Sequence, residues 1–384
     1  MTAMTVSIDE VESRASAATG GLEQFGDDDY RAGLDVLLAA AADSPHAGPE
    51  LDERVRRSAV SALASRLSSE AAWTAHPQTP RSELPPQVVI IGLPRSGTTA
   101  LHQIMAADAS FQWIPAWLAP RPKPRPPVSE WDEDPERRAQ VVLHRSRGPN
   151  RLHDVGPDDP EECIQIMRQS FVNMTWVSSE AVPAYHEWFI EQDERPSYRR
   201  YSDNLRLIGG ADHERPWLLK NPSHTFGMAS MLDVFPEAVF VHIYRDPVDS
   251  IVSGCSLITS ITSGSGGGFK PNELGAHRLR IWALAADRMM AARDAAPDRK
   301  FLDVDYRAFV SDPVQTVRSV YGELDRPLGP ETIAAMKNWA AQRPQNQHGT
   351  HRYAASEFGL SEQIIRARMA AFTERFAIEP AGRS

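Results

Sequence analysis

The sequence of 384 residues has few features that would tie it to a membrane, a metal ion or an oxidising compartment. Its only two cysteines, Cys163 and Cys255, are far apart and form neither a C-x-x-C pair nor a zinc-binding spacing, so we expect buried thiols and no metal. No apolar run reaches the length of a membrane span, and the N-terminal stretch is polar and acidic, unlike a signal peptide. We therefore expect a cytoplasmic protein without a transmembrane segment.

Positive charge is also scarce, because the formal net charge is −10. A protein with this charge balance is not expected to bind nucleic acid or an anionic membrane as its main partner. An anionic ligand would have to be held by a local group of Arg and Lys side chains. The length of the chain allows one large α/β domain with additions, or two domains.

The most informative stretch of the chain is Gln87–Met105. Within it, Val88–Ile91 is a continuous apolar run of β-branched residues, which is typical of a strand buried on both faces of a parallel sheet. Gly92 and Gly97 mark a turn, and from Thr98 onward apolar residues recur at helical spacing. A strand, loop and helix in this order point backbone N–H groups and the positive end of a helix dipole at one spot, which suits an anion.

The turn matches the phosphate-loop pattern G-x-x-x-x-G-K-[ST] at both glycines and at the hydroxyl of Thr99, but Thr98 stands where the pattern has lysine. In nucleotide hydrolases that lysine offsets phosphate charge, and the hydroxyl binds magnesium. Here the positive charge lies inside the loop, on Arg95. A guanidinium without a metal suits a less charged group, such as a sulfuryl beside a single phosphate.

The run Leu93–Thr99 resembles the 5′-phosphosulfate loop of sulfotransferases that use 3′-phosphoadenosine 5′-phosphosulfate (PAPS), in the form with arginine where other branches have lysine. The resemblance implies an α/β fold, in which a P-loop-containing parallel sheet is flanked by helices. It also implies PAPS as the sulfuryl donor. The loop residues implied in donor binding are Pro94, Arg95, Ser96, Gly97, Thr98 and Thr99.

A second anion site is expected after the predicted strand Ala238–Tyr244. Arg245 leaves the end of this strand, Pro247 begins a helix, and Ser253 returns to the same face of the helix two turns later. Two anion sites of different construction at neighbouring strand ends suit a bisphosphorylated adenosine. The run resembles the 3′-phosphate motif of the same sulfotransferases, which implies that Arg245 and Ser253 bind the 3′-phosphate.

Further strands are expected at Trp217–Lys220 and within Lys300–Phe309. Ligands of open parallel sheets bind beyond the carboxyl ends of the strands, so we expect Lys220 and His224 to project on the same side as Arg95. The family resemblance implies that Lys220 stabilises the leaving oxygen. It also implies a tyrosine near the adenine and a late loop that closes over the nucleotide, for which the candidates are Tyr306, His348, Arg352 and Tyr353.

Three residues are candidates for the base that takes the proton of the acceptor, namely Glu161, Glu162 and His224. The two glutamates follow Asp159 and Pro160, so this run is either a helix start capped by Asp159 or the source of a catalytic carboxylate. His224 is either a site residue or a helix cap after its strand. The Lys-x-His of the best-known branch is absent, and the sequence leaves these alternatives open.

We expect residues 1–85 to form a helical N-terminal extension, with a helical pattern from Ile8 to about Trp73 that breaks at residues 44–49. Residues 86–384 would form the sulfotransferase-like domain, with an aromatic-rich helical insertion at about residues 110–210. The insertion suggests an apolar or glycosylated acceptor, such as a lipid, polyketide or glycolipid, that offers a hydroxyl or an amine. The rival functions are an ATP- and magnesium-dependent kinase and a non-catalytic nucleotide-binding scaffold. The oligomeric state cannot be predicted from the sequence.

Overall fold

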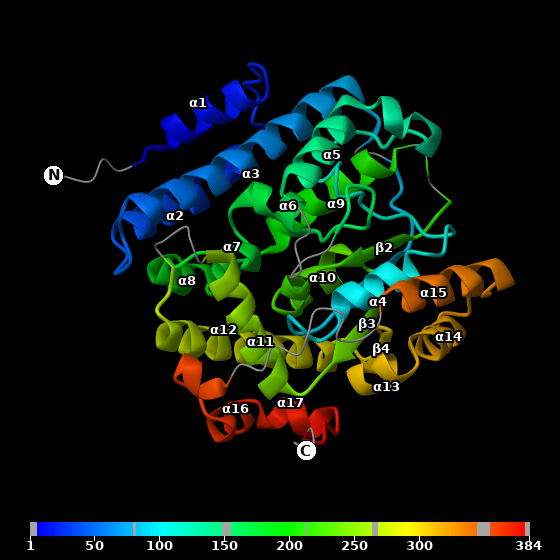
Figure 1. Ribbon diagram of the computed structural model, residues 1–384. Helices are drawn as coiled ribbons and strands as arrows, with labels where there is room; N and C mark the ends of the chain where they lie inside the picture. Colours follow the sequence, from blue (N-terminus) through cyan, green and yellow to red (C-terminus); the bar gives the residue numbers. More distant parts are fainter. Residues whose placement is uncertain are drawn as a thin grey trace. The chain divides into compact units, whose positions relative to one another are not determined.

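The computed structural model describes residues 6–79, 82–147, 155–210, 212, 214–262, 268–343 and 354–380 (Figure 1). These residues form two compact units. The helical unit is drawn from Met1–Pro85, Ile114–Glu214 and Ile261–Phe269, and the sheet unit from Pro86–Trp113, Arg215–Ser260 and Lys270–Ser384. Within the described ranges, none of the helices combines the length and the apolar character that crossing a bilayer requires.

The sheet unit is built on four parallel strands in the order β2-β1-β3-β4. The strands are β1 (Gln87–Ile91), β2 (Trp217–Lys220), β3 (Val239–Tyr244) and β4 (Phe301–Asp305). They coincide with the four predicted strands and confirm the α/β fold class. Because β2 and β3 lie on opposite sides of β1, the carboxyl end of β1 is a topological switch point, where open parallel sheets bind ligands.

One face of the sheet carries the main apolar core of the unit. It packs against α4 (Thr98–Met105), α14 (Pro313–Glu323) and α15 (Pro330–Gln342), which lie together in Figure 1. Side chains alternate between the two faces of a strand, and Leu218 of β2 belongs to this core. Lys220, two residues further along, therefore projects toward the α4 side.

The opposite face of the sheet carries a charged cluster around the buried His242. Arg293 of α12 (Pro271–Asp294) donates to both carboxylate oxygens of Asp303 in β4, at 2.8 and 2.6 Å. The ring of His242 in β3 lies with Nδ1 3.0 Å from the same carboxylate, and it packs against aromatic residues of α17 (Ala370–Arg375) and just beyond it. The other helices of the sheet unit are η5 (Pro222–Thr225), α10 (Met228–Val234), α11 (Pro247–Thr262), α13 (Tyr306–Ser311), η6 (Ala355–Phe358) and α16 (Glu362–Arg368).

The helical unit contains the N-terminal helices and the predicted insertion. Its elements are α1 (Ile8–Ala18), η1 (Asp28–Tyr30), α2 (Arg31–Ala42), α3 (Pro49–Ala75), η3 (Val128–Glu133), α5 (Pro135–Arg147), α6 (Ile164–Met167), η4 (Arg168–Ser170), α7 (Met174–Ser179), α8 (Pro183–Phe189) and α9 (Arg195–Gly209). The predicted break at residues 44–49 is confirmed, since α2 ends at Ala42 and α3 begins at Pro49. The helical pattern expected from Ile8 onward is also interrupted earlier, because the chain leaves the helix after Ala18. Gly20, Gly21 and Gly26 have φ values of 74°, 96° and 72°, which a right-handed helix cannot contain.

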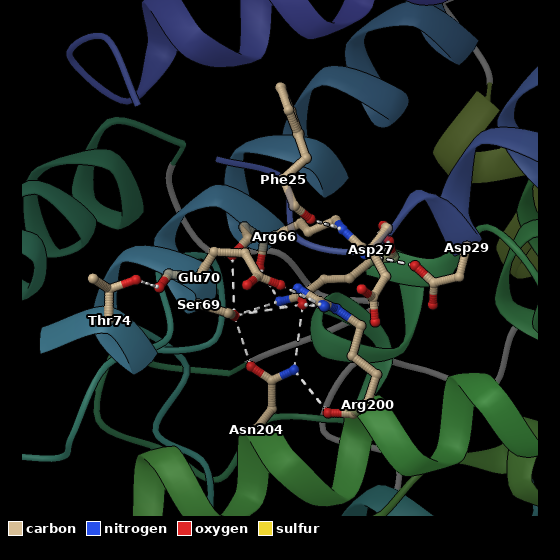
Figure 2. Close-up of polar contacts among 11 residues, drawn as sticks. Phe25, Asp27, Asp29, Arg66, Ser69, Glu70, Thr74, Arg200 and Asn204 are labelled. Atoms are coloured by element: carbon tan, nitrogen blue, oxygen red, sulfur yellow. Dashed lines mark hydrogen bonds and ion pairs between the residues drawn. The ribbon is translucent and has the colours of Figure 1, made fainter. Parts of the chain in front are cut away.

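A buried polar network joins α3 to the insertion within the helical unit (Figure 2). At its centre is Arg66, whose exposed fraction is 0%. Its guanidinium donates to the backbone oxygens of Phe25, Asp27 and Gln169 and to the carboxylate of Asp29. Ser69, one turn further along α3, donates to the amide oxygen of Asn204 in α9 at 2.7 Å. The N-terminal helices and the insertion are thus fastened by polar contacts with specific geometry.

Candidate functional site

The loop between β1 and α4 has a conformation that only glycine tolerates at its two ends. Gly92 and Gly97 have φ values of 147° and 101°. A Cβ atom at Gly92 would collide with the carbonyl oxygen of Ile243, and one at Gly97 would lie 2.8 Å from the ring of Tyr306. Arg95, at the tip of the loop, also has a positive φ of 68°. A non-glycine residue held in this region indicates a conformation imposed by its surroundings.

The loop ends in a helix start that can bind an anion. Gly97 is the N-cap of α4 and supplies no side-chain cap, so helix geometry leaves the first N–H groups of α4 without an acceptor from the helix. The loop itself is braced from within. The buried Ser96 hydroxyl donates to the carbonyl oxygen of Leu93 at 2.7 Å, and the Thr225 hydroxyl lies 3.3 Å from both N and O of Gly92. Sequence reasoning missed Thr225, which belongs to η5.

Two arginines meet beside the loop. Arg95 donates from Nε to the hydroxyl of Ser253 at 3.1 Å, and Arg245 donates from Nη1 to the backbone oxygen of Arg95 at 3.1 Å. The guanidinium of Arg245 lies 4.5 Å from the ring centre of Tyr306 and also pairs with Asp249 at 3.1 Å. The residues of the two predicted anion sites therefore adjoin, and the Arg95 side chain lies at the second of them.

The charges at this point favour an anionic ligand. Partial removal from water, followed by the positive charge of Arg245, lowers the pKa of Arg95. A pKa lowered in this way means that the structure disfavours the charged form of Arg95. A phosphate placed between the two guanidinium groups would reverse that effect, because it would accept hydrogen bonds from both.

Lys220 lies on the other side of the helix start. It is 1% exposed at the end of β2, and its ammonium donates to the Thr99 hydroxyl at 3.1 Å. Thr98, the preceding residue, is itself buried. The structure thus brings a lysine and a loop hydroxyl together at the first turn of α4, as the strand-end argument predicts.

His224 is fully buried in η5. Burial lowers its pKa to about 3, so the imidazole is neutral at pH 7 and is a weak base. The interpretation of His224 as the helix cap is wrong, because the Asn221 side chain caps η5 by accepting from the N–H of Ser223. Asn221 is another residue that sequence reasoning missed, although an Asn before Pro at a strand end is a recognisable cap.

Glu161 and Glu162 belong to the helical unit. The helix start predicted for this run is wrong, because α6 begins at Ile164 and Pro160 instead forms an antiparallel bridge with Pro115. The carboxylate of Glu161 accepts from the N–H of Glu162 at 2.7 Å. The two glutamates therefore lie in a non-helical segment, and their catalytic role stays a prediction.

Three predicted donor-binding residues, His348, Arg352 and Tyr353, lie outside the described residues. The aromatic residues of the insertion are mostly interior. Phe171 and Trp176 stack at 4.8 Å and are fully buried, as are Tyr185, Phe189 and Tyr201. These rings form the core of the helical unit. Among the described residues, no group of three or more His, Cys, Asp and Glu side chains is placed to hold a metal ion.

A glycine loop at the switch point of a parallel sheet, with arginines and a lysine around a helix start, defines a P-loop-type transferase fold. Residues 86–330 match the sulfotransferase family, and the chain belongs to that family. It is 29% identical over 170 residues to omega-hydroxy-beta-dihydromenaquinone-9 sulfotransferase Stf3 of Mycobacterium bovis and of Mycobacterium tuberculosis, a match that covers 42% of this chain and 42% of each relative.

Two solved structures resemble nearly the whole chain. Sulfotransferase STF1 of Mycobacterium tuberculosis H37Rv has a TM-score of 0.87 and 33% identity, covering 96% of this chain and 99% of that one. Sulfotransferase STF9 of Mycobacterium avium also has a TM-score of 0.87, with 27% identity and complete coverage of both chains. The predicted family and fold are thereby confirmed.

Proposed function

We propose that the protein transfers a sulfuryl group from PAPS to a hydroxyl or amine of an apolar small-molecule acceptor and releases adenosine 3′,5′-bisphosphate. The observation that carries this proposal is the convergence of Arg95, Arg245 and Ser253 beside the glycine loop. A nucleoside triphosphate such as ATP has no 3′-phosphate to occupy the second anion site, at Arg245 and Ser253. Membership of the sulfotransferase family supports the same donor.

We assign the site residues to two tasks, binding the donor and supporting the transfer reaction. The first N–H groups of α4, with Thr98 and Thr99, hold the 5′-phosphosulfate, and Arg245 and Ser253 hold the 3′-phosphate. Arg95 spans the two groups because its backbone lies in the loop while its side chain reaches Ser253. The donor supplies an activated S–O bond, so the protein has mainly to position the reactants and stabilise charge.

Lys220 stabilises the oxygen that bridges phosphorus and sulfur in PAPS. The bond from this oxygen to sulfur breaks while sulfur forms a bond to the acceptor oxygen. The acceptor proton passes to Glu161, Glu162 or His224. The pKa of His224, about 3, favours the glutamates as the base at neutral pH. The acceptor class is supported by the name of Stf3, which describes the hydroxyl of a lipid-like menaquinone derivative. A lipid alcohol is therefore the first acceptor to test, ahead of polyketides and glycolipids.

The proposal is tested by binding and by transfer. Calorimetry should show tight binding of adenosine 3′,5′-bisphosphate and weak binding of ATP with magnesium, and ³⁵S-labelled PAPS should transfer label to farnesol or 2-naphthol. Arg95→Ala should lower kcat/KM roughly 30- to 900-fold, since a charge-assisted contact in such a site is worth about 2 to 4 kcal/mol. Arg368→Ala, which removes an exposed pair with Asp287, is the control.

Each alternative function has its own outcome. Preferential binding of ATP with magnesium would indicate a phosphotransferase. Tight binding of adenosine 3′,5′-bisphosphate with no release of it from PAPS would indicate a non-catalytic nucleotide-binding protein. Wild-type turnover in Arg95→Ala would show that the loop does not have the assigned role.

A further inference from the structure

A buried histidine that donor binding does not explain lies one turn behind the glycine loop. His102 is on α4, three residues after Thr99, and is 1% exposed. Its Nε2 lies 3.3 Å from the backbone oxygen of Leu218, which precedes Lys220 by two residues in β2. A carbonyl oxygen can only accept a hydrogen bond, so the imidazole donates from Nε2 and leaves Nδ1 as an acceptor.

The Leu218 carbonyl lies on the outer edge of the sheet. β2 is the edge strand next to β1, and the N–H of Leu218 donates to the backbone oxygen of Gln112 and not to β1. The N–H and C=O of one residue in a strand point to the same side, so the carbonyl also faces away from β1. A buried carbonyl without a partner is costly, and His102 supplies the partner.

The surroundings keep His102 neutral. Burial, followed by the positive charge of Lys220, lowers its pKa to about 3. Its Nδ1 has no hydrogen-bond partner among the described residues. An apolar side chain of similar size would fill this place without an unpartnered Nδ1, but it would leave the Leu218 carbonyl without its donor. Packing alone therefore does not explain a histidine here.

We propose that His102 is a positioning residue for Lys220. Its hydrogen bond to the Leu218 carbonyl ties the end of the edge strand to the first turns of α4, so that the Lys220 ammonium meets the Thr99 hydroxyl at the glycine loop. The inference rests on the proposed function, in which Lys220 acts on the leaving oxygen. It adds a residue that contacts neither donor nor acceptor and acts through the strand end.

Two substitutions separate this role from simple packing. His102→Phe keeps the volume and removes the donor, so kcat should fall about tenfold or more while KM for PAPS changes less than about threefold. His102→Gln keeps an N–H donor that can reach the same carbonyl, so kcat should recover to within about threefold of the wild type. Both variants should bind adenosine 3′,5′-bisphosphate as the wild type does, which also shows that they are folded.

The decisive experiment is a double-mutant cycle with Lys220→Met. The measured quantity is the transfer of label from ³⁵S-labelled PAPS to farnesol or 2-naphthol. If His102 acts through Lys220, His102→Phe should change kcat less than about twofold in the Lys220→Met background. The inference would be overturned if His102→Phe lowered kcat by the same factor in the Lys220→Met background as in the wild type. It would also be overturned if His102→Phe alone had the kcat of the wild type.

Failure of the proposed function would be seen differently. Wild-type protein that binds PAPS but releases no adenosine 3′,5′-bisphosphate with either acceptor would contradict the proposed function, and this inference would fall with it. If the wild type is active and the effects of His102→Phe and Lys220→Met on kcat are independent, only the role of His102 is contradicted.

Discussion

At the scale of single residues, the site contains cations that lie close together and histidines that stay neutral. Arg95 and Arg245 are held beside each other by the loop carbonyl and by Ser253, an arrangement that would suit a doubly charged phosphate. The buried His224 cannot take a proton easily at pH 7, since its pKa is about 3. We therefore expect charge stabilisation and proton transfer to belong to different residues.

The identity of the base can be tested with matched substitutions. With Glu162 as the base, Glu162→Gln should lower kcat about 100-fold or more, because a glutamine cannot take up the proton of the acceptor. Glu161→Gln should have a small effect, because an amide oxygen can still accept from the Glu162 N–H. His224→Asn should change kcat only a few-fold. The measurement is kcat at saturating PAPS, with adenosine 3′,5′-bisphosphate affinity as the control for folding.

The assignment would be reversed if His224→Asn lost turnover while Glu162→Gln kept it and both variants still bound the nucleotide. Equal losses in Glu161→Gln and Glu162→Gln would instead show that this segment acts through its backbone conformation, and that no single carboxylate is the base.

At the scale of elements, α16 supports the turn that carries Arg245. Arg366 donates to the carboxylate of Asp246 at 3.0 Å, and the same carboxylate caps the first turn of α11 by accepting from the N–H of Val248 at 2.9 Å. Asp246 is 7% exposed and directly follows Arg245. The C-terminal part of the sheet unit thus fixes the start of α11, and with it the direction of the Arg245 side chain.

Arg366→Ala should therefore weaken the binding of adenosine 3′,5′-bisphosphate about 3- to 10-fold, as the loss of a partly exposed charge-assisted bond predicts. The kcat value at saturating PAPS should stay near that of the wild type, since Arg366 is not expected to contact the reacting atoms. Arg368→Ala, two residues away and paired with the exposed Asp287, is the control. Unchanged nucleotide affinity in Arg366→Ala, measured by calorimetry, would rule out this support.

The network around Arg66 gives a second prediction for an element, namely α3. Arg66→Met should lower the free energy of unfolding by about 2 to 4 kcal/mol, because it leaves the buried carbonyl of Gln169, the carbonyls of Phe25 and Asp27 and the Asp29 carboxylate without their donor. Arg138→Met is the matched control, since its pair with Glu133 is 57% and 80% exposed and should contribute less than about 1 kcal/mol. Urea unfolding measures both, and equal losses would contradict a structural role for the network.

The same elements show what the local sequence could predict. The strand β1 and the helix start at Pro247 are correct because a continuous apolar run and a proline at N1 are local properties. The helix start at Pro160 is wrong because Pro160 pairs with Pro115, and that pairing depends on segments distant in sequence. The Asp159 carboxylate does accept a hydrogen bond from a backbone N–H, as a cap would. Its partner is the N–H of Gly156 in a turn and not the first turn of a helix.

At the scale of the whole molecule, the sequence pointed to the loop and strand-end residues that the structure brings together, but not to the residues that support them. Arg95 and Ser253 are separated by 158 residues and were found because each lies in its own motif. His102 and Thr225 have no such motif, and their roles appear only when β2, α4 and η5 are in place. Motifs thus identified the groups expected to touch the ligand, whereas supporting residues required the tertiary structure.

Burial of neutral histidines also gives the whole protein a dependence on pH. His102 and His224 have pKa values of about 3 in the folded protein, against 6.5 for an ordinary histidine, and burial lowers the pKa of His242 as well. Below pH 6.5 the unfolded chain binds protons that the folded protein does not, so the free energy of unfolding falls as the pH falls. Between pH 7 and pH 5, His102 and His224 should each lower the free energy of unfolding by about 2 kcal/mol.

This loss is measured by urea unfolding at several pH values between 7 and 5. That range lies above the ordinary pKa of carboxylates. The pKa of Asp303 is lowered further, so this residue contributes only in more acidic solution. His102→Gln and His224→Asn should each remove about 2 kcal/mol of the pH-dependent change, and the double variant should remove both contributions and leave that of His242. The three residues lie in the sheet unit, so acid should weaken that unit while the histidines themselves remain uncharged in the folded form. A double variant with the wild-type pH dependence would show that these imidazoles are protonated within the folded protein, and that the donor site is more open to water than their burial indicates.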